Sequence, residues 1–265
     1  MAKLSGTILF IHGMYMTPLC WELWVPWFEG RGYRCLAPPW PGRGESPETL
    51  RSRHPDPKAA ELTLAEVVAE MERVISALPE RPILIGHSMG ALVAQLLMQK
   101  GRAAAVVAID SAPPAGVLSA KWSFLKSNWP HITPFAPLSL PIAITPERFA
   151  YAFAETLTAT ERRAAFERYT VPESRRVPRQ SLTAFARVDF AKPHEPLLFI
   201  AGSADNIVPA SLNRKNYRRY SRSASVAAFR EFAGRTHFII GQAGWEEVAA
   251  YAASWLEDPR PGDRV

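Results

Sequence analysis

Cysteine is scarce in this sequence. Only two of the 265 residues are cysteines, Cys20 and Cys35. A chain of this length with 48% hydrophobic residues can bury a full core, so it does not need a disulfide to hold its fold. No group of Cys and His residues has the spacing of a zinc site. We therefore expect no metal and no cofactor, and whether the two cysteines ever pair stays open.

Long hydrophobic runs are also absent. The first residues, "MAKLSGTILFIHG", contain an apolar run of only five residues, which is shorter than the apolar core of a signal peptide. No segment is long and apolar enough to cross a bilayer. These absences predict a cytoplasmic protein with no membrane span.

Positive charge is in excess, with a formal net charge of +6. Residues 115–192 hold 11 Lys/Arg and 6 Asp/Glu, a net of +5, and residues 210–235 hold 7 Lys/Arg and one Glu, a net of +6. Basic stretches can attract nucleic acid, but no nucleic-acid-binding motif accompanies them. We interpret them as solvated helix faces and expect no nucleic-acid partner, while a partner for the 210–235 face stays open.

Six short apolar runs rich in β-forming residues predict six strands. Continuous apolar runs are typical of a parallel sheet that is covered on both faces. The predicted strands are 7–11, 33–38, 82–86, 105–110, 196–202 and 225–232.

Helical patterns lie between these runs. Residues 63–78 place their apolar side chains on one face, with Thr63 and Glu66 as a capping box at the start and Pro79 at the end. A shorter helix is predicted to start near Thr17 and to be bent or ended early by Pro26, and residues 244–257 read as the last helix. Strands that alternate with helices favour an α/β fold with a doubly wound, mostly parallel sheet of about six strands.

One stretch interrupts the alternation. About 85 residues separate the strands 105–110 and 196–202, far more than one crossover helix needs. This stretch has a Pro- and aromatic-rich part, 121–146, followed by helical patterns around 146–169 and 174–187. We predict a core formed by residues 1–114 and 193–265, with 115–192 inserted as a helical lid.

The stretch "LIGHSMGALVAQLL" (84–97) contains the strongest motif. Ser88 lies between Gly86 and Gly90, after a predicted strand and before a run of helix formers. A tight strand-turn-helix exposes a nucleophilic serine, and residues two before and two after it must be small because they crowd together. In this context Gly-x-Ser-x-Gly predicts a nucleophile elbow at Ser88.

A serine nucleophile needs a base, and the base needs a carboxylate that orients it. His237 follows the last predicted strand, and Asp205 follows the strand before it, in "AGSADNIVP". The chain order Ser, Asp, His matches this architecture, so we predict a triad of Ser88, Asp205 and His237. Asp110, also at a strand end, is the rival acid, and its expected role is structural, as a cap on the turn into the lid.

An oxyanion would need two preorganised N–H donors. We predict the backbone N–H groups of Met89, just after the nucleophile, and of Met14, in the loop "HGM" after the first strand. His12 is expected to hold that loop in place by hydrogen bonds.

Four motifs together resemble those of the α/β-hydrolase superfamily: "FIHGM", "LIGHSMG", "AGSADNIVP" and "GRTHF". They occur in the order that is typical of this superfamily, and the resemblance covers nearly the whole chain. The chain is most similar to bacterial single-domain hydrolases and esterases with a helical cap, and this resemblance implies the α/β-hydrolase fold and the triad roles. Ser rather than Asp at the elbow argues against the epoxide-hydrolase and haloalkane-dehalogenase branches. Only about six residues precede the first strand, where many members have a hairpin, so six strands are expected.

The aromatic residues of the lid predict an apolar pocket. We expect it to be lined by Tyr15, His87, Trp122 and Trp129, and Arg43 is a candidate for binding a substrate carboxylate. The predicted function is a serine hydrolase that cleaves a small, apolar carboxylic ester, lactone or thioester. The alternatives are another reaction of the same triad, by a C–C hydrolase, perhydrolase or lyase, or a ligand-binding receptor. Sequence motifs alone leave the substrate and the oligomeric state open.

Overall fold

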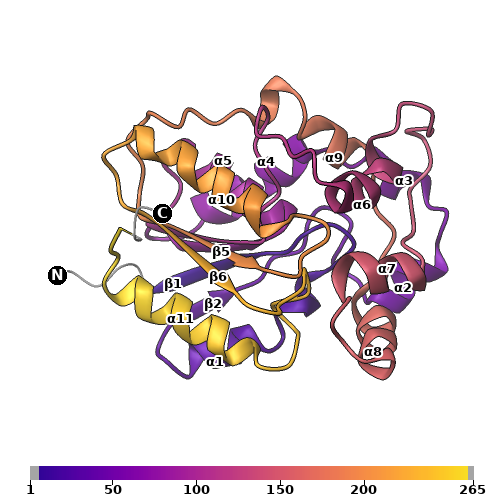
Figure 1. Ribbon diagram of the computed structural model, residues 1–265, viewed down its shortest axis with the longest axis horizontal. Coiled ribbons are helices and arrows are strands. Elements are labelled where there is room, and N and C mark those ends of the chain that lie inside the picture. The colour runs from indigo at the N-terminus through magenta and orange to yellow at the C-terminus, as the bar shows by residue number, and fades with distance from the viewer. Residues whose placement is uncertain (1–5, 262–265) are drawn as a thin grey trace.

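The computed structural model describes residues 6–261. Its centre is a parallel sheet of six strands in the order β2-β1-β3-β4-β5-β6 (Figure 1). The strands are β1 (Thr7–Ile11), β2 (Arg34–Leu36), β3 (Ile83–His87), β4 (Ala105–Ile109), β5 (Leu197–Gly202) and β6 (Ala227–Phe232). All six predicted strands are confirmed. The edge strand β2 is shorter than predicted, because it pairs with β1 over only three residues.

Eleven α-helices are present among the described residues. They are α1 (Trp24–Glu29), α2 (Pro47–Ser52), α3 (Pro57–Glu61), α4 (Leu64–Ser76), α5 (Met89–Gln99), α6 (Trp122–Ile132), α7 (Pro146–Phe153), α8 (Ala159–Tyr169), α9 (Arg176–Gln180), α10 (Ala210–Arg219) and α11 (Trp245–Glu257). Short 3-10 helices lie at Pro18–Trp21, Ala184–Ala186 and Tyr220–Arg222. Between residues 6 and 261, none of the helices combines the length and the apolar character that a membrane span requires.

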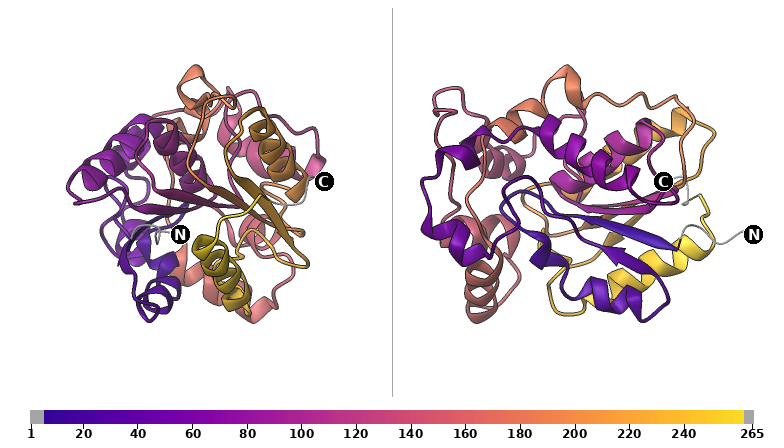
Figure 2. Two further views of the ribbon diagram at one scale, coloured as in Figure 1. Left: turned by 90° about the vertical axis from the view of Figure 1, so that its left-hand side faces the viewer. Right: turned by 180° about the vertical axis from the view of Figure 1, so that it is seen from behind.

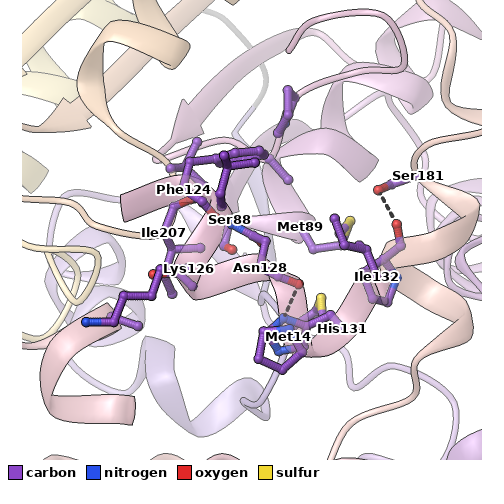
Figure 3. A pocket seen from close by; sticks show the side chains of 18 of the residues that line it. Met14, Ser88, Met89, Phe124, Lys126, Asn128, His131, Ile132, Ser181 and Ile207 are labelled. Carbon is purple, nitrogen blue, oxygen red and sulfur yellow. Dashed lines mark hydrogen bonds between the residues drawn. The ribbon is translucent and has the colours of Figure 1, made fainter. Parts of the chain in front are cut away.

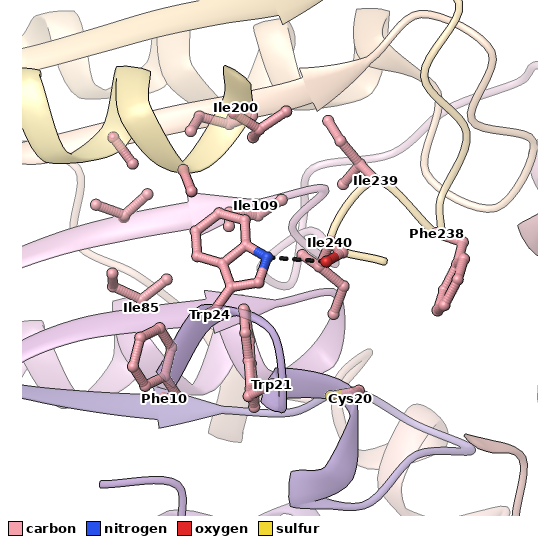
Figure 4. Close-up of a cluster of buried hydrophobic side chains, with 14 of the residues drawn as sticks. Phe10, Cys20, Trp21, Trp24, Ile85, Ile109, Ile200, Phe238, Ile239 and Ile240 are labelled. Atoms are coloured by element: carbon pink, nitrogen blue, oxygen red, sulfur yellow. Dashed lines mark hydrogen bonds between the residues drawn. The ribbon is translucent and has the colours of Figure 1, made fainter. Parts of the chain in front are cut away.

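Alternating strand residues build two apolar layers, one on each face of the sheet. Ile8 and Phe10 of β1 face one layer, and Leu9 and Ile11 face the other. Helices α1 and α11 cover the first face, whereas α4, α5 and α10 cover the second (Figures 1 and 2). Figure 4 shows the first layer, in which the indole N–H of Trp24 donates to the carbonyl of Ile240 at 2.8 Å. Because helices cover both faces, the sheet leaves its carboxyl edge for a site.

Most predicted helices are confirmed, with two differences near prolines. The capping box of Thr63 and Glu66 is present at the start of α4, which ends at Ser76, before Pro79. Pro26 does not end a helix. It lies in the first turn of α1, where a missing backbone N–H costs no intrahelical hydrogen bond. Helix α6 was not predicted inside 121–146, because Pro130 and the surrounding prolines masked its pattern.

The segment between β4 and β5, here called the insertion (residues 115–192), holds α6 to α9. Figure 1 shows these helices beyond the carboxyl ends of the strands. An antiparallel bridge between Ile142 and Glu173 joins its two halves. The insertion therefore faces the same edge at which the predicted site residues lie.

Candidate active site

Three segments that follow neighbouring strands have a non-glycine residue in the left-handed region. These residues are Tyr15 after β1 (φ 63°), Ser88 after β3 (φ 57°) and Asp110 after β4 (φ 43°). Within residues 6–261 they are the only non-glycine residues with positive φ. Such backbone strain clusters at functional sites, so the carboxyl edge of the sheet is the candidate site.

Ser88 occupies a sharp turn between β3 and α5. Its N–H donates to the carbonyl of Ile109 at 2.9 Å, and its own carbonyl accepts from the N–H of Ala112 at 3.0 Å. A Cβ at Gly90 would collide with the carbonyl oxygens of Ile11 and His12, and a Cβ at Gly86 would collide with the backbone of Gly90. Both glycines are therefore required for the close approach that the motif predicted.

His237 and Asp205 form a buried pair. The Nδ1 atom of His237 lies 2.6 Å from Oδ2 of Asp205, and both side chains are fully shielded from solvent. The other carboxylate oxygen of Asp205 accepts the N–H groups of Ile207 and Val208, at 2.7 and 2.8 Å. With Nδ1–H donating to the carboxylate, the lone pair of His237 is at Nε2, which has no hydrogen-bond partner among the described residues.

Asp110 lies beside this pair and is fully buried. Its Oδ1 accepts the N–H of Gly202 at 2.8 Å, so it ties β4 to the end of β5 and does not cap the turn as predicted. Burial, with the nearby carboxylate of Asp205, raises the pKa of Asp110 well above its usual range. This environment favours the neutral form of Asp110, whereas Asp205 is hydrogen-bonded to His237.

His87 is also buried in this cluster. Its Nε2–H donates to the backbone carbonyl of His237 at 2.8 Å, and burial lowers its pKa well below the usual value. Because its side chain is fully buried and does not line the cavity, the prediction that His87 is a pocket residue is wrong.

Polar atoms of His87, Asp110 and His237 lie within 4.8 Å of one another. Within the described part of the chain, this spacing would allow the three side chains to bind one cation together.

The loop after β1 approaches Ser88 closely. A Cβ at Gly13 would lie 2.8 Å from the Cβ and 3.3 Å from the Oγ of Ser88, so only glycine allows this backbone so near the serine. His12 holds the loop, as expected: its Nδ1–H donates to the carbonyl of Gly13 at 2.9 Å, and its Nε2 accepts from the N–H of Trp40 at 3.3 Å. Met14 and Met89, the predicted sources of the N–H donors, both line the cavity beside Ser88.

The cavity in front of Ser88 has a volume of about 860 Å³, within the range of small-molecule sites. Figure 3 shows Ser88 and Met89 among side chains that the insertion contributes, including Phe124 and Ile132. Tyr15 lines the cavity, as predicted. The aromatic lining from the insertion consists of Phe124, Tyr151 and Phe153.

The two tryptophans predicted for the pocket lie elsewhere. Trp122 is 74% exposed and Trp129 is 56% exposed, and neither lines the cavity. Both lie on α6, whose other side supplies Phe124 and Asn128 to the cavity. A list of aromatic residues cannot separate the two sides of a helix when the helix itself is not recognised in the sequence.

Sequence reasoning missed a polar group that joins the insertion to the core. The N–H of Tyr15 donates to Oε2 of Glu173 at 3.0 Å, and Oε1 of this buried carboxylate accepts from Arg43 at 2.7 Å. The hydroxyl of Tyr15 donates to Nε2 of His131, whose pKa burial lowers to about 4. The prediction that Arg43 binds a substrate carboxylate is wrong: Arg43 is buried, does not line the cavity and is paired with Glu173 of the protein itself. No sequence signal marks partners 130 or more residues apart.

Comparisons with known proteins agree with this architecture. The model of the Alpha/beta hydrolase family matches residues 8–251. A search of curated proteins found no match. Among solved structures, a Paleococcus ferrophilus monoacylglycerol lipase has a TM-score of 0.70 at 20% identity, over 96% of this chain and 95% of that one.

Two further solved structures, which match over a similar share of both chains, have the same fold. A pyrethroid hydrolase from Sphingobium faniae JZ-2 has a TM-score of 0.66 at 18% identity, and tomato methylketone synthase I has a TM-score of 0.67 at 12% identity. Each comparison covers 96% of this chain and 98% of the other. At these identities the likeness shows the fold alone. With the family match over most of its length, the chain belongs to the alpha/beta hydrolase family.

Proposed function

We propose that this chain is a serine hydrolase that cleaves a carboxylic ester, or a lactone or thioester, through an acyl-enzyme. The observation that carries the proposal is the buried pair of His237 and Asp205, with Nε2 of His237 free of hydrogen-bond partners among the described residues. Ser88, raised on its strained turn, lies on the wall of the adjoining cavity. This combination of nucleophile, base and orienting carboxylate is what acyl transfer requires.

In the proposed reaction, Nε2 of His237 takes the proton of the Ser88 hydroxyl as Oγ attacks the substrate carbonyl. The N–H groups of Met14 and Met89 stabilise the negative oxygen of the tetrahedral intermediate. His237 then gives the proton to the departing alcohol, which leaves Ser88 acylated. Water, deprotonated by His237, attacks the acyl group; as the bond to Oγ breaks, His237 returns the proton to Ser88 and the carboxylic acid is released. Asp205 keeps the imidazole in the required tautomer throughout, and no cofactor enters these steps.

The wall of the cavity favours an apolar acyl or alcohol group. Its lining includes apolar residues of the core, such as Val208, and of the insertion, such as Ile142 and Ile144. We assign the insertion the role of a lid, since it supplies much of this wall. The lipase activity named for one of the similar structures agrees with this substrate class.

The test is turnover of a p-nitrophenyl ester series, from acetate to decanoate, by the wild type and by Ser88→Ala. A burst of p-nitrophenol that is lost in the variant would support the acyl-enzyme route, and the chain-length profile would measure the pocket. Labelling of Ser88 by a fluorophosphonate without ester turnover would contradict the ester class and favour another reaction of the same triad. Neither labelling nor turnover would contradict the whole proposal.

A further inference from the structure

The large apolar side chains that are strongly exposed within residues 6–261 all belong to the insertion. They are Leu118, Trp122, Leu125, Trp129, Phe135, Leu140, Leu182 and Phe185, here called the exposed apolar face. Phe135 is 89% exposed and Trp122 is 74% exposed. Single exposed apolar residues are ordinary, but this concentration in one segment indicates an interaction surface.

Helix α6 is the centre of this face. Trp122, Leu125 and Trp129 recur at spacings of three and four residues, so they lie along one side of the helix. No residue of α6 is fully buried. Arg179 of α9 donates to the carbonyl of Ala136, four residues after the end of α6, at 2.8 Å, and Leu182 lies three residues further along the chain. The two exposed regions are therefore neighbours.

The exposed apolar face is continuous with the mouth of the cavity. Leu118, Leu125 and Leu182 are exposed to solvent and also line the cavity in front of Ser88. A ligand that leaves an apolar phase at this face would pass from one apolar surface to the next without crossing water. This path favours a lipid phase over a folded protein as the occupant.

The charges along α6 are positive, although the exposed Glu147 of α7 also lines the cavity. Residues 111–146 contain no Asp or Glu, whereas Lys121 and Lys126 are exposed along α6. Lys215 of the basic stretch 210–235 reaches the same region, since its Nζ donates to the carbonyl of Leu118 at 2.8 Å. Helices that lie at a membrane surface place tryptophans at the level of the lipid headgroups and lysines near the anionic phosphates. Helix α6 has this composition.

We propose that the exposed apolar face docks on an anionic lipid surface, with the tryptophans of α6 in the interfacial region. The cavity mouth then opens toward the lipid. If the docked protein also has the proposed function, its substrate is an apolar ester that enters the cavity from the lipid phase. Only this statement about the substrate rests on the proposed function. The docking itself requires only the side chains of the face and does not depend on the reaction at Ser88.

The experiment is co-flotation of the full chain with vesicles of phosphatidylcholine alone and of phosphatidylcholine with phosphatidylglycerol. The wild type should float with the anionic vesicles, and W122S/W129S should bind them at least tenfold more weakly. Lys121→Gln should weaken binding several-fold, whereas Lys58→Gln, an exposed lysine on α3, should not change it. None of these residues lines the cavity, so turnover of water-soluble p-nitrophenyl acetate should be unchanged in all of them.

Absence of flotation, or equal flotation of W122S/W129S and the wild type, would overturn the proposal. So would concentration-dependent dimerisation that the double variant abolishes, because the face would then bind a second copy of the chain. Ser88→Ala should float as the wild type does. Binding that persists in a protein without ester turnover would therefore contradict the proposed function and leave the docking intact.

Discussion

The sheet and the insertion use apolar side chains in opposite ways. Strands β1, β3, β4 and β5 are buried along their whole length, whereas α6 of the insertion has no fully buried residue. The sheet fixes the positions of Ser88, Asp205 and His237 through strand ends and buried hydrogen bonds. The insertion supplies a cavity wall and an exposed surface.

This difference suggests a division of roles. A rigid sheet can hold reacting groups within the small tolerances that catalysis requires. A segment packed at one edge can change its surface residues without disturbing that geometry. If this division is correct, changes in the core should affect the chemical step and global stability, and changes in the insertion should affect binding and local order.

The largest expected effect separates the two buried aspartates of the core. Asp205→Asn should lower kcat by about 10⁴-fold, because the amide would select the wrong tautomer of His237. Asp110→Asn should change kcat by less than about threefold, since an amide keeps the acceptor for Gly202 and resembles the neutral carboxyl that burial favours. Steady-state kinetics on one p-nitrophenyl ester measures both variants. A greater loss of kcat in Asp110→Asn than in Asp205→Asn would show that Asp110, and not Asp205, is the carboxylate that orients His237.

The buried ion pair that joins the two regions gives the next largest effect. Glu173→Gln leaves Arg43 buried without a counter-charge, which should cost about 3–5 kcal/mol of unfolding free energy. Turnover should also fall, because Glu173 holds the strained backbone of Tyr15. Urea denaturation followed by fluorescence gives the free energy. The control is Glu167→Gln on α8, an exposed ion-pair partner, which should unfold as the wild type does.

Two glycine substitutions compare steric demand in the core and in the insertion. Gly90→Ala should destabilise the fold by about 3 kcal/mol, because its Cβ meets backbone carbonyls that cannot move aside. Gly116→Ala should cost only about 1–2 kcal/mol of left-handed strain, since nothing lies within 4 Å of its Cβ. Thermal denaturation of both variants shows which one loses more stability. Equal losses in Gly90→Ala and Gly116→Ala would contradict the rigidity assigned to the core.

The last effect is a pH dependence of stability, in which contributions of opposite sign partly cancel. Burial lowers the pKa of His12 to about 3 and of His131 to about 4, and it also lowers that of His87. Below about pH 6.5 the unfolded chain binds protons that the folded chain does not. The free energy of unfolding therefore decreases as the pH is lowered, by up to about 1.4 kcal/mol per pH unit for each histidine.

Asp110 acts with the opposite sign, because the folded chain keeps a proton that the unfolded chain has lost above about pH 4. Denaturation at pH 7, 6 and 5 should therefore show a net loss, which is smaller in His131→Gln and larger in Asp110→Asn. Stability that is constant from pH 7 to 5 in the wild type would contradict the neutral burial of the histidines.

The sequence by itself determined the sheet and the residues that follow its strands at the carboxyl edge. Strand runs and the Gly-x-Ser-x-Gly motif are local patterns, and the glycines at 86 and 90 are required by atoms only a few residues away or on the neighbouring strand. That Ser88, Asp205 and His237 lie at the same edge then follows from the topology of a parallel sheet, in which all carboxyl ends meet at one edge.

Only the tertiary structure decided which side chains of the insertion face the cavity and which face solvent. Trp122 and Phe124 are two residues apart in one aromatic stretch, yet one is exposed and the other lines the cavity. The bonds of Glu173 to Tyr15 and Arg43 join positions 130 to 158 residues apart. No periodic pattern encodes such contacts, because they depend on how the insertion packs on the sheet as a whole.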